Sequence, residues 1–308
     1  MRHSFCLGAS LLLALGIEGA FCPAPRAQVA PPGSGSSDYT RSVESWRATR
    51  EASLKADDGW LTLVGLHWLR EGQNRVGGMP AADIPLPPGQ APPEVGTIFF
   101  AGGTARFEPK PGVDVRINGA LARTQVLRTQ PGTYDVVEVS SVRFFVIKRG
   151  DRYGVRVRDL NSPGRRDFGG LRWYPIREHW RVTGRFIRHP KPTSIMIANV
   201  LGAVEPWPSP GKVLFTVNGR ELTLHPVLDG PGAKELFFIF RDGTTGSGTY
   251  PGGRVLYSEM PKNGQVVLDF NKAESPPCAF TAFATCPLPP KENALPVQIE
   301  AGELNPHL

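Results

Sequence analysis

The residues best suited to chemistry gather near the end of the chain, in a proline-rich segment that contains Cys278 and Cys286. A cysteine thiolate is a nucleophile when a nearby base or positive charge lowers its pKa. His179, His189 and His225 are candidate bases, although no spacing ties them to this segment. The alternative is a disulfide, the usual state of a cysteine pair in an oxidising compartment. We predict the disulfide over a free catalytic thiol.

A second set of polar residues precedes and brackets that segment. A guanidinium and a phenol beside a glycine turn could bind the carboxylate or phosphate of a small ligand. The structural interpretation is an Asx-type turn at Asp242 and a salt bridge from Arg254 to Asp242. The two asparagines would brace the main chain of the loop, because proline nitrogens cannot donate hydrogen bonds. We predict a ligand-binding site of six residues: Asp242, Thr244, Tyr250, Arg254, Asn271 and Asn293.

A hydrolase is the alternative, with a cysteine or a carboxylate of the C-terminal segment as the reacting group. Glu300 and Glu303 add carboxylates there. The sequence has no Gly-x-Ser-x-Gly elbow, no His-Glu-x-x-His and no Cys-x-x-Cys pattern. No metal site is predicted, and the motifs assign neither a cofactor nor a catalytic residue. A purely structural envelope protein is the third hypothesis.

The N-terminus is typical of an export signal. Arg2 and His3 supply a basic start, and the apolar stretch Phe5–Ile17 is too short to span a bilayer. We therefore expect residues 1–30 to be a signal peptide and the protein to be periplasmic or secreted. Lipid anchoring at Cys22 is less favoured, because a large residue precedes it. Cleavage removes the two N-terminal cysteines and leaves the C-terminal pair.

Composition limits the class of partner. The chain has 308 residues and a formal net charge of +7, and its charges are scattered along the sequence. A scattered charge without a nucleic-acid-binding motif argues against a nucleic acid as the partner. A small molecule is the favoured partner, and we expect no transmembrane helix in the mature chain. The sequence specifies no oligomeric state.

The elements that must position these residues are mainly β-strands. After a linker over 31–37, helical spacing predicts one amphipathic helix over 38–57. The face expected to pack on the body of the protein has five members: Tyr39, Val43, Trp46, Arg50 and Leu54.

From Trp60 onward the period changes to two, and the 35 glycines and 31 prolines favour many short strands. We predict a β-sandwich-like domain over 58–161, packed on a β-rich C-terminal domain over 162–308. Glycine turns predict hairpins at Gly150-Asp151, Asn218-Gly219 and Asn263-Gly264.

Three segments resemble a family catalogued as domain of unknown function 1684. They are 58–77, 148–159 and 269–293, and the resemblance covers roughly residues 38–304. It implies no activity, because none is assigned to the family. One departure is Ala273-Glu274-Ser275, where an Ala-Tyr-Asn type of sequence is expected, so a role for an asparagine there does not carry over.

The N-terminal half also has a weaker likeness, at the level of the fold, to forkhead-associated β-sandwiches, in the order of segments such as 69–77 and 115–119. Those domains read phosphothreonine through an arginine and a serine. Here Gly78 stands at the arginine position and Pro92-Pro93-Glu94 in the serine region, so the likeness implies the fold without phosphopeptide binding.

The hypothesis that we favour is an exported β-rich protein that binds a small ligand, with an anion as first candidate. Its cleft would lie beside the C-terminal loop 276–290, which we call the Pro/Cys loop.

Overall fold

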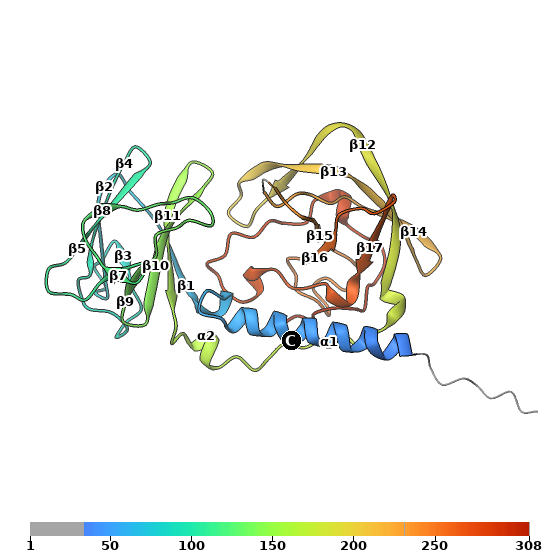
Figure 1. Ribbon diagram of the computed structural model, residues 1–308, viewed down its shortest axis with the longest axis horizontal. Helices are drawn as coiled ribbons and strands as arrows, with labels where there is room; N and C mark the ends of the chain where they lie inside the picture. Colours follow the sequence, from blue (N-terminus) through green and yellow to red (C-terminus); the bar gives the residue numbers. More distant parts are fainter. Residues whose placement is uncertain (1–33, 231, 308) are drawn as a thin grey trace, which may run out of the picture.

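The computed structural model describes residues 34–230 and 232–307. The expected signal peptide and Cys22 lie outside the described residues. The fold is mainly β with an N-terminal helix, as the sequence predicts (Figure 1). Within the described part of the chain, no helix combines the length and apolar character needed to cross a membrane.

The N-terminal half forms two sheets. The first has six strands in the order β1-β11-β10-β9-β6-β7. Its strands are β1 (Leu63–Trp68), β6 (Arg116–Ile117), β7 (Ala120–Leu121), β9 (Val137–Val139), β10 (Val142–Arg149) and β11 (Arg152–Asp159). The second has five strands in the order β3-β2-β4-β5-β8. Its strands are β2 (Gly72–Gly77), β3 (Ile84–Pro85), β4 (Gly96–Ala101), β5 (Thr104–Pro109) and β8 (Gln125–Val126).

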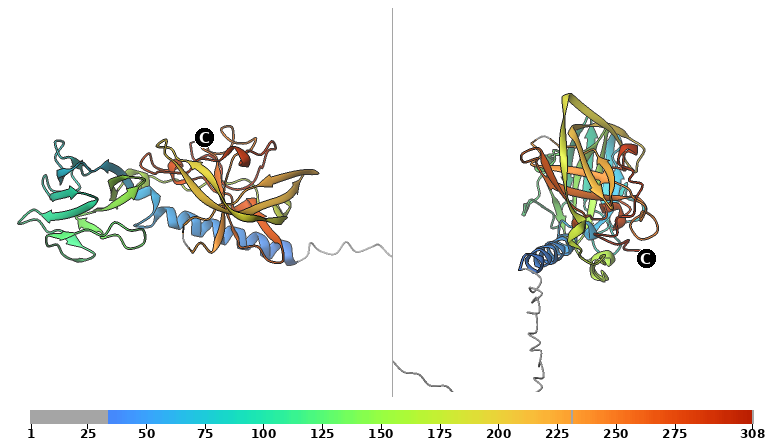
Figure 2. Two further views of the ribbon diagram at one scale, coloured as in Figure 1. Left: turned by 90° about the horizontal axis from the view of Figure 1, so that it is seen from above. Right: turned by 90° about the vertical axis from the view of Figure 1, so that its right-hand side faces the viewer.

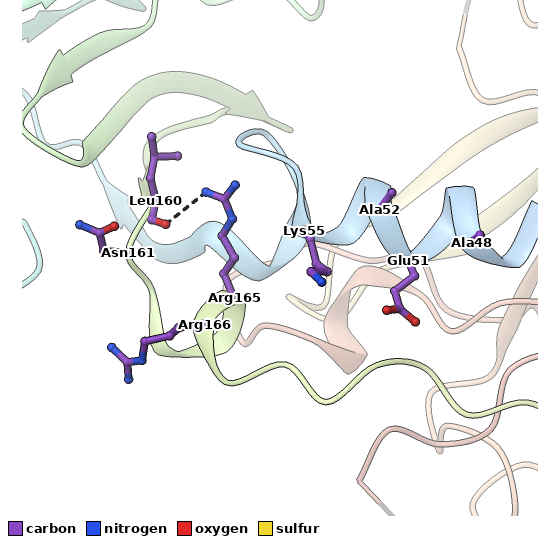
Figure 3. A pocket seen from close by; sticks show the side chains of 8 residues that line it. All are labelled: Ala48, Glu51, Ala52, Lys55, Leu160, Asn161, Arg165 and Arg166. Atoms are coloured by element: carbon purple, nitrogen blue, oxygen red, sulfur yellow. Dashed lines mark hydrogen bonds between the residues drawn. The ribbon is translucent and has the colours of Figure 1, made fainter.

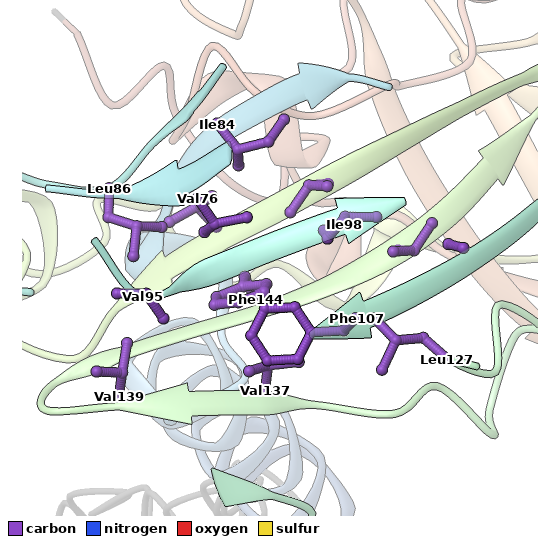
Figure 4. Close-up of a cluster of buried hydrophobic side chains, with 14 of the residues drawn as sticks. Val76, Ile84, Leu86, Val95, Ile98, Phe107, Leu127, Val137, Val139 and Phe144 are labelled. Atoms are coloured by element: carbon purple, nitrogen blue, oxygen red, sulfur yellow. The ribbon is translucent and has the colours of Figure 1, made fainter. Parts of the chain in front are cut away.

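One hydrophobic core fills the space between these sheets. Period-two alternation sends one face of each strand inward, so that Phe107 of β5 meets Phe144 of β10 with ring centroids 5.8 Å apart (Figure 4). Strand β11 departs from the usual half-buried pattern, because all residues from Gly154 to Asp159 are buried. Its valines face the core, and Arg156 and Arg158 are covered on the opposite face.

The C-terminal half contains a four-stranded sheet in the order β14-β13-β12-β17 and a separate β15-β16 pair. The strands are β12 (Arg181–Ala198), β13 (Val204–Val217), β14 (Arg220–Leu224), β15 (Glu235–Phe240), β16 (Arg254–Glu259) and β17 (Gln265–Asp269). A second core lies here, in which Phe270 packs against Phe215 and Phe240.

Short helical turns complete the chain. They are η1 (Trp60–Thr62), α2 (Pro163–Arg166), η2 (Glu178–Trp180), η3 (Phe270–Lys272), η4 (Pro277–Ala279) and η5 (Lys291–Asn293).

The N-terminal helix α1 (Ser34–Lys55) begins four residues before the predicted start at Asp38. It runs beneath the C-terminal half toward the sandwich (Figures 1 and 2). Val43 and Leu54 are fully buried, and Trp46 meets Trp173 edge to face. The predicted packing face is therefore confirmed.

Two of the three predicted hairpins form as expected. β10 and β11 join at Gly150, and β13 and β14 join at Asn218-Gly219, where both turn residues have positive φ. The third prediction was wrong. The Asn263-Gly264 turn exists, but β17 pairs with β12 and β16 pairs with β15. A turn signal reports local backbone geometry, and which sheet each flanking strand joins depends on distant partners.

Candidate functional site

Asp242 and Arg254, two of the predicted ligand-binding residues, form a buried ion pair. Oδ2 of Asp242 lies 2.6 Å from Nη2 of Arg254, and their side chains are 0% and 1% exposed. Arg254 also donates to the carbonyls of Ile299 and Ala301, which anchors the C-terminal segment. Thr244 donates to Asp242 from its amide and its hydroxyl, as in an Asx turn. These residues do come together, but as a brace in the interior of the protein.

The other predicted residues bind main chain in separate places. Asn271 bridges the amide and carbonyl of Arg177, and Asn293 does the same for His225. Tyr250 donates its hydroxyl to the carbonyl of Cys278 at 3.1 Å. Tyr250 thus braces the Pro/Cys loop, whereas the two asparagines brace main chain outside it, at Arg177 and His225. The proposed ligand-binding role of these residues stays a prediction.

Cys278 and Cys286 lie within disulfide-bonding distance, with Cα atoms 6.2 Å apart. A bonded pair has no thiolate to act as nucleophile. Among the described residues, no group of three or more histidine, cysteine, aspartate and glutamate side chains is arranged to hold a metal ion.

Two carboxylates are buried beneath α1. Arg50 Nε lies 3.1 Å from Glu274 and 3.5 Å from Glu303, and Arg50 also donates to the carbonyl of Ser275. Burial raises the pKa of Glu303 to about 7, against the opposing effect of Arg50. Burial also raises the pKa of Glu274, and Arg50 again opposes the change. Ser275 faces Glu303, yet neither carboxylate oxygen of Glu303 accepts a hydrogen bond of ordinary geometry from a described residue.

A pocket of 570 Å³ opens on the outer face of the six-stranded sheet. Strands β1 and β11 of this sheet lie on the side of the sandwich nearer to the C-terminal half (Figure 1). We call this cavity the Trp60 pocket. Its floor comes from the residues of β10 and β11 that point away from the sandwich core, since Phe145 is paired with Arg156 and Arg143 with Arg158. Its walls add Trp60 from η1 and Tyr134 from the loop before β9.

Arg156 is the most unusual residue of this pocket. Its side chain is buried to 7% exposure, and its guanidinium carbon lies 5.4 Å from the centre of the Trp60 ring. Burial, together with the charges of the neighbouring Arg149 and Arg158, lowers its pKa to about 10. Its Nε has no hydrogen-bond partner among the residues that the structure describes. Its Nη2 makes a long contact, at 3.4 Å, with the hydroxyl of Thr285.

Arg158 lies beside it and is also buried, at 9% exposure. It donates to the carbonyl of Gly59 and, at 2.9 Å, to the hydroxyl of Thr62. Burial lowers its pKa, and the charge of Asp58 opposes that change. Within the described ranges, neither Arg156 nor Arg158 has a carboxylate oxygen within 4.0 Å. The pocket therefore holds two buried cations that no described carboxylate pairs with.

The Pro/Cys loop reaches the same face. Thr285, next to Cys286 in the chain, accepts a hydrogen bond from Arg149 at 3.1 Å as well as the contact from Arg156. Thr281 donates to the carbonyl of Leu63 in β1 at 2.8 Å. The loop is thus packed against the sandwich, and it contacts Arg156 of the pocket.

A larger groove of 1020 Å³ lies between α1 and α2, but both of its arginines already have partners (Figure 3). Arg165 binds Asp57 and the carbonyl of Leu160, and Arg166 binds Asp167. The two arginines also point in different directions (Figure 3). An anion would therefore find no unpaired arginine among the described residues of this groove, in contrast to the Trp60 pocket.

The sequence contained a signal for Arg156 and Arg158 that was not recognised. They alternate with Val155 and Val157, so they had to share the face opposite the core. A single strand does not reveal whether that face is covered, and exposure to solvent is the default expectation for arginine.

A family model matches the C-terminal part of the chain, and it describes a family of unknown function. Residues 166–304 match a family described as "Protein of unknown function (DUF1684)". The C-terminal half of the chain therefore resembles this family, in agreement with the resemblance seen in the sequence. The match covers its C-terminal half, a smaller part than the resemblance in the sequence covers. No curated protein matches the chain.

Solved structures give more distant matches. An uncharacterized protein from Haloarcula marismortui is 31% identical over 46% of this chain and 80% of its own length, with a TM-score of 0.39. The FhaA FHA domain, solved with the intracellular domain of Rv3910, is 19% identical over 30% of this chain and 97% of its own, with a TM-score of 0.22. An FHA structure described for phosphothreonine-dependent interactions is 20% identical over 32% and 96%, also with a TM-score of 0.22. At these scores the FHA likeness adds nothing to the observed sheets.

Proposed function

We propose that this protein, whose C-terminal half matches the DUF1684 family, is an exported binding protein that takes a small anionic ligand in the Trp60 pocket. The observation that carries the proposal is the burial of Arg156 and Arg158 without a carboxylate partner among the described residues. An unpaired buried charge costs stability, so a cleft that holds two of them is a good candidate for a functional site.

The geometry supports binding more than catalysis. Pockets of 300–1,000 Å³ with aromatic walls and a few polar groups are typical of small-molecule sites. The Trp60 pocket has that size and lining. Among the described residues, those that line it include no histidine, cysteine, serine or threonine. The ligand-binding cleft expected beside the Pro/Cys loop is thus proposed at a different set of residues from Asp242 and Arg254.

The test compares two matched substitutions in β11 of the full mature protein. Arg156→Met removes a buried guanidinium of the pocket, whereas Arg152→Met removes an exposed one stacked on Trp68. A thermal-shift screen with small anions is run on the wild type and both variants. We expect at least one anion to stabilise the wild type and Arg152→Met, and to lose its effect on Arg156→Met. If every anion acts equally on all three proteins, or on none, the proposal fails.

An enzymatic alternative has one observation in its favour, the raised pKa of Glu303 near Glu274. A carboxylic acid that titrates near neutral pH suits general acid–base catalysis. Neither glutamate lines the Trp60 pocket, and Arg50 covers both. Hydrolytic activity that disappears in Glu303→Gln while Arg156→Met retains it would favour this alternative over the binding protein.

Export is part of the proposal and rests on the apolar N-terminal stretch Phe5–Ile17. Expression of the full chain in a Gram-negative host, followed by fractionation and N-terminal sequencing, tests it. We expect a periplasmic mature protein whose first residue lies between Pro23 and Pro31, whereas an uncleaved cytoplasmic chain contradicts export.

A further inference from the structure

We infer that the ligand of the Trp60 pocket is a monoanion with a flat aromatic body. Its carboxylate binds Arg156 and Arg158, and its ring lies among Trp60, Tyr134 and Phe145. This inference rests on the proposed function and specifies the class of ligand.

The aromatic body of the ligand is inferred from the rings that lie beside the two buried arginines. The Tyr134 and Phe145 rings are 5.1 Å apart, and Arg158 lies 5.9 Å from the Phe145 ring. Arg156 lies 5.4 Å from Trp60. Each guanidinium therefore adjoins an aromatic surface. A ligand whose carboxylate is attached directly to a ring fits such an arrangement, because ring faces prefer offset or edge contacts with other rings at 4.5–7 Å.

The charge of the ligand is inferred from the three carboxylates of the pocket, which we call the rim. Asp57, Asp58 and Glu138 line the pocket together with Arg143, Arg156 and Arg158, so the lining is formally neutral. Arg143 lies 3.2 Å from Asp57 and 3.8 Å from Glu138, so it is engaged at the rim. The two inner arginines remain for one anionic group. A second anionic group on the ligand would face the rim carboxylates, and like charges repel.

This arrangement disfavours nucleotides and other polyphosphates. It also disfavours small aliphatic acids, which would leave the aromatic walls unfilled. Arginine suits carboxylate recognition because its planar fork binds both oxygens at once.

The experiment measures the binding of four probes by isothermal titration calorimetry at pH 7. They are 2-naphthoate, its neutral amide 2-naphthamide, the dianion 2,6-naphthalenedicarboxylate, and acetate. We expect 2-naphthoate to bind at least about tenfold more tightly than each of the others, the scale of one lost charge-assisted contact. Arg156→Met should weaken its binding by about tenfold or more, and Arg152→Met should leave it unchanged.

The rim is tested separately. Asp58→Asn combined with Glu138→Gln should reduce the preference for 2-naphthoate over the dianion to a few-fold, because two negative charges leave the mouth. An unchanged preference would overturn the role given to the rim.

The failures of the two proposals differ. If the dianion or acetate binds more tightly than 2-naphthoate and still depends on Arg156, the aromatic monoanion is wrong and the anion pocket stands. If no anion binds in a manner that depends on Arg156, both proposals are wrong. Melting temperatures of each variant show that a loss of binding is not a loss of folding.

Discussion

The guanidinium of Arg156 lies 5.4 Å from the centre of the Trp60 ring, in a pocket where it has no carboxylate partner among the described residues. Cation–π contact offsets part of the cost of burying the charge. The pKa of Arg156 is nevertheless lowered, chiefly by burial, so the buried charge is incompletely compensated.

Arg156→Met is therefore expected to stabilise the protein while it weakens binding of the anion. Replacement of a poorly compensated buried charge by a side chain of similar volume is often neutral or favourable, and we expect a gain of about 1 kcal/mol. Urea denaturation at pH 7 measures it, with Arg152→Met as the control. A loss of stability of about 1 kcal/mol or more would mean that Arg156 is a structural residue.

Asp242→Ala should have the opposite effect. It leaves Arg254, which is 1% exposed, without its charge partner, and we expect a loss of about 3–5 kcal/mol. The control is Asp167→Ala, which breaks the exposed pair of Arg166 and Asp167 and should cost no more than about 1 kcal/mol. Equal losses for the two variants would show that the interior pair is not a brace.

Glu303 predicts a pH dependence of stability. Its folded pKa of about 7 lies above the ordinary value of 4.5, so the folded state holds its proton more strongly than the unfolded state. This contribution is fully present below pH 4.5 and is lost as pH rises to about 7, and it amounts to at most about 3 kcal/mol.

Glu303→Gln should remove that slope, because the amide is neutral at every pH. We expect the variant to match the wild type near pH 4.5 and to be more stable near pH 7.5, as measured by urea denaturation at both values. Glu259→Gln is the control, since Glu259 is exposed beside Lys262. A variant that runs parallel to the wild type would mean that Glu303 is ionised when folded.

The disulfide is expected to hold Thr285 in contact with Arg156 of the pocket. Replacement of Cys278 and Cys286 by alanine opens a loop with a sequence separation of 8 and should cost about 2–3 kcal/mol. Because Thr285 adjoins Cys286 and contacts Arg149 and Arg156, we also expect weaker binding of 2-naphthoate.

Thiol titration of the unreduced, denatured protein should detect no free thiol in the mature chain. Two free thiols per molecule would restore the cysteine nucleophile as a hypothesis. The control for the double alanine variant is Thr285→Val, which keeps the disulfide and removes only the hydroxyl.

Local patterns predicted local structure well. Helical spacing identified the buried face of α1, including Val43 and Leu54, and the Asn218-Gly219 pair identified a hairpin. These features depend on residues close in sequence, where periodicity and turn chemistry act directly.

The pocket could not be predicted in this way, because its parts come from distant segments. Trp60, Tyr134 and Arg156 are brought together only when the outer face of a sheet is covered. The polar residues near Arg254 attracted attention through their proximity in sequence, and the structure uses that proximity for an interior brace. Closeness along the chain indicated shared structure, but not access to solvent.

The contact between Thr285 and Arg156 also has a consequence for the order of assembly. The sandwich half is translated first, yet Thr285, which follows it by more than a hundred residues, contacts its arginine face. Until the Pro/Cys loop has been synthesised and released, Arg156 of β11 lacks its contact with Thr285. Competence to bind should therefore appear only after this late segment has emerged, and its truncation should damage a surface that was synthesised long before the missing residues.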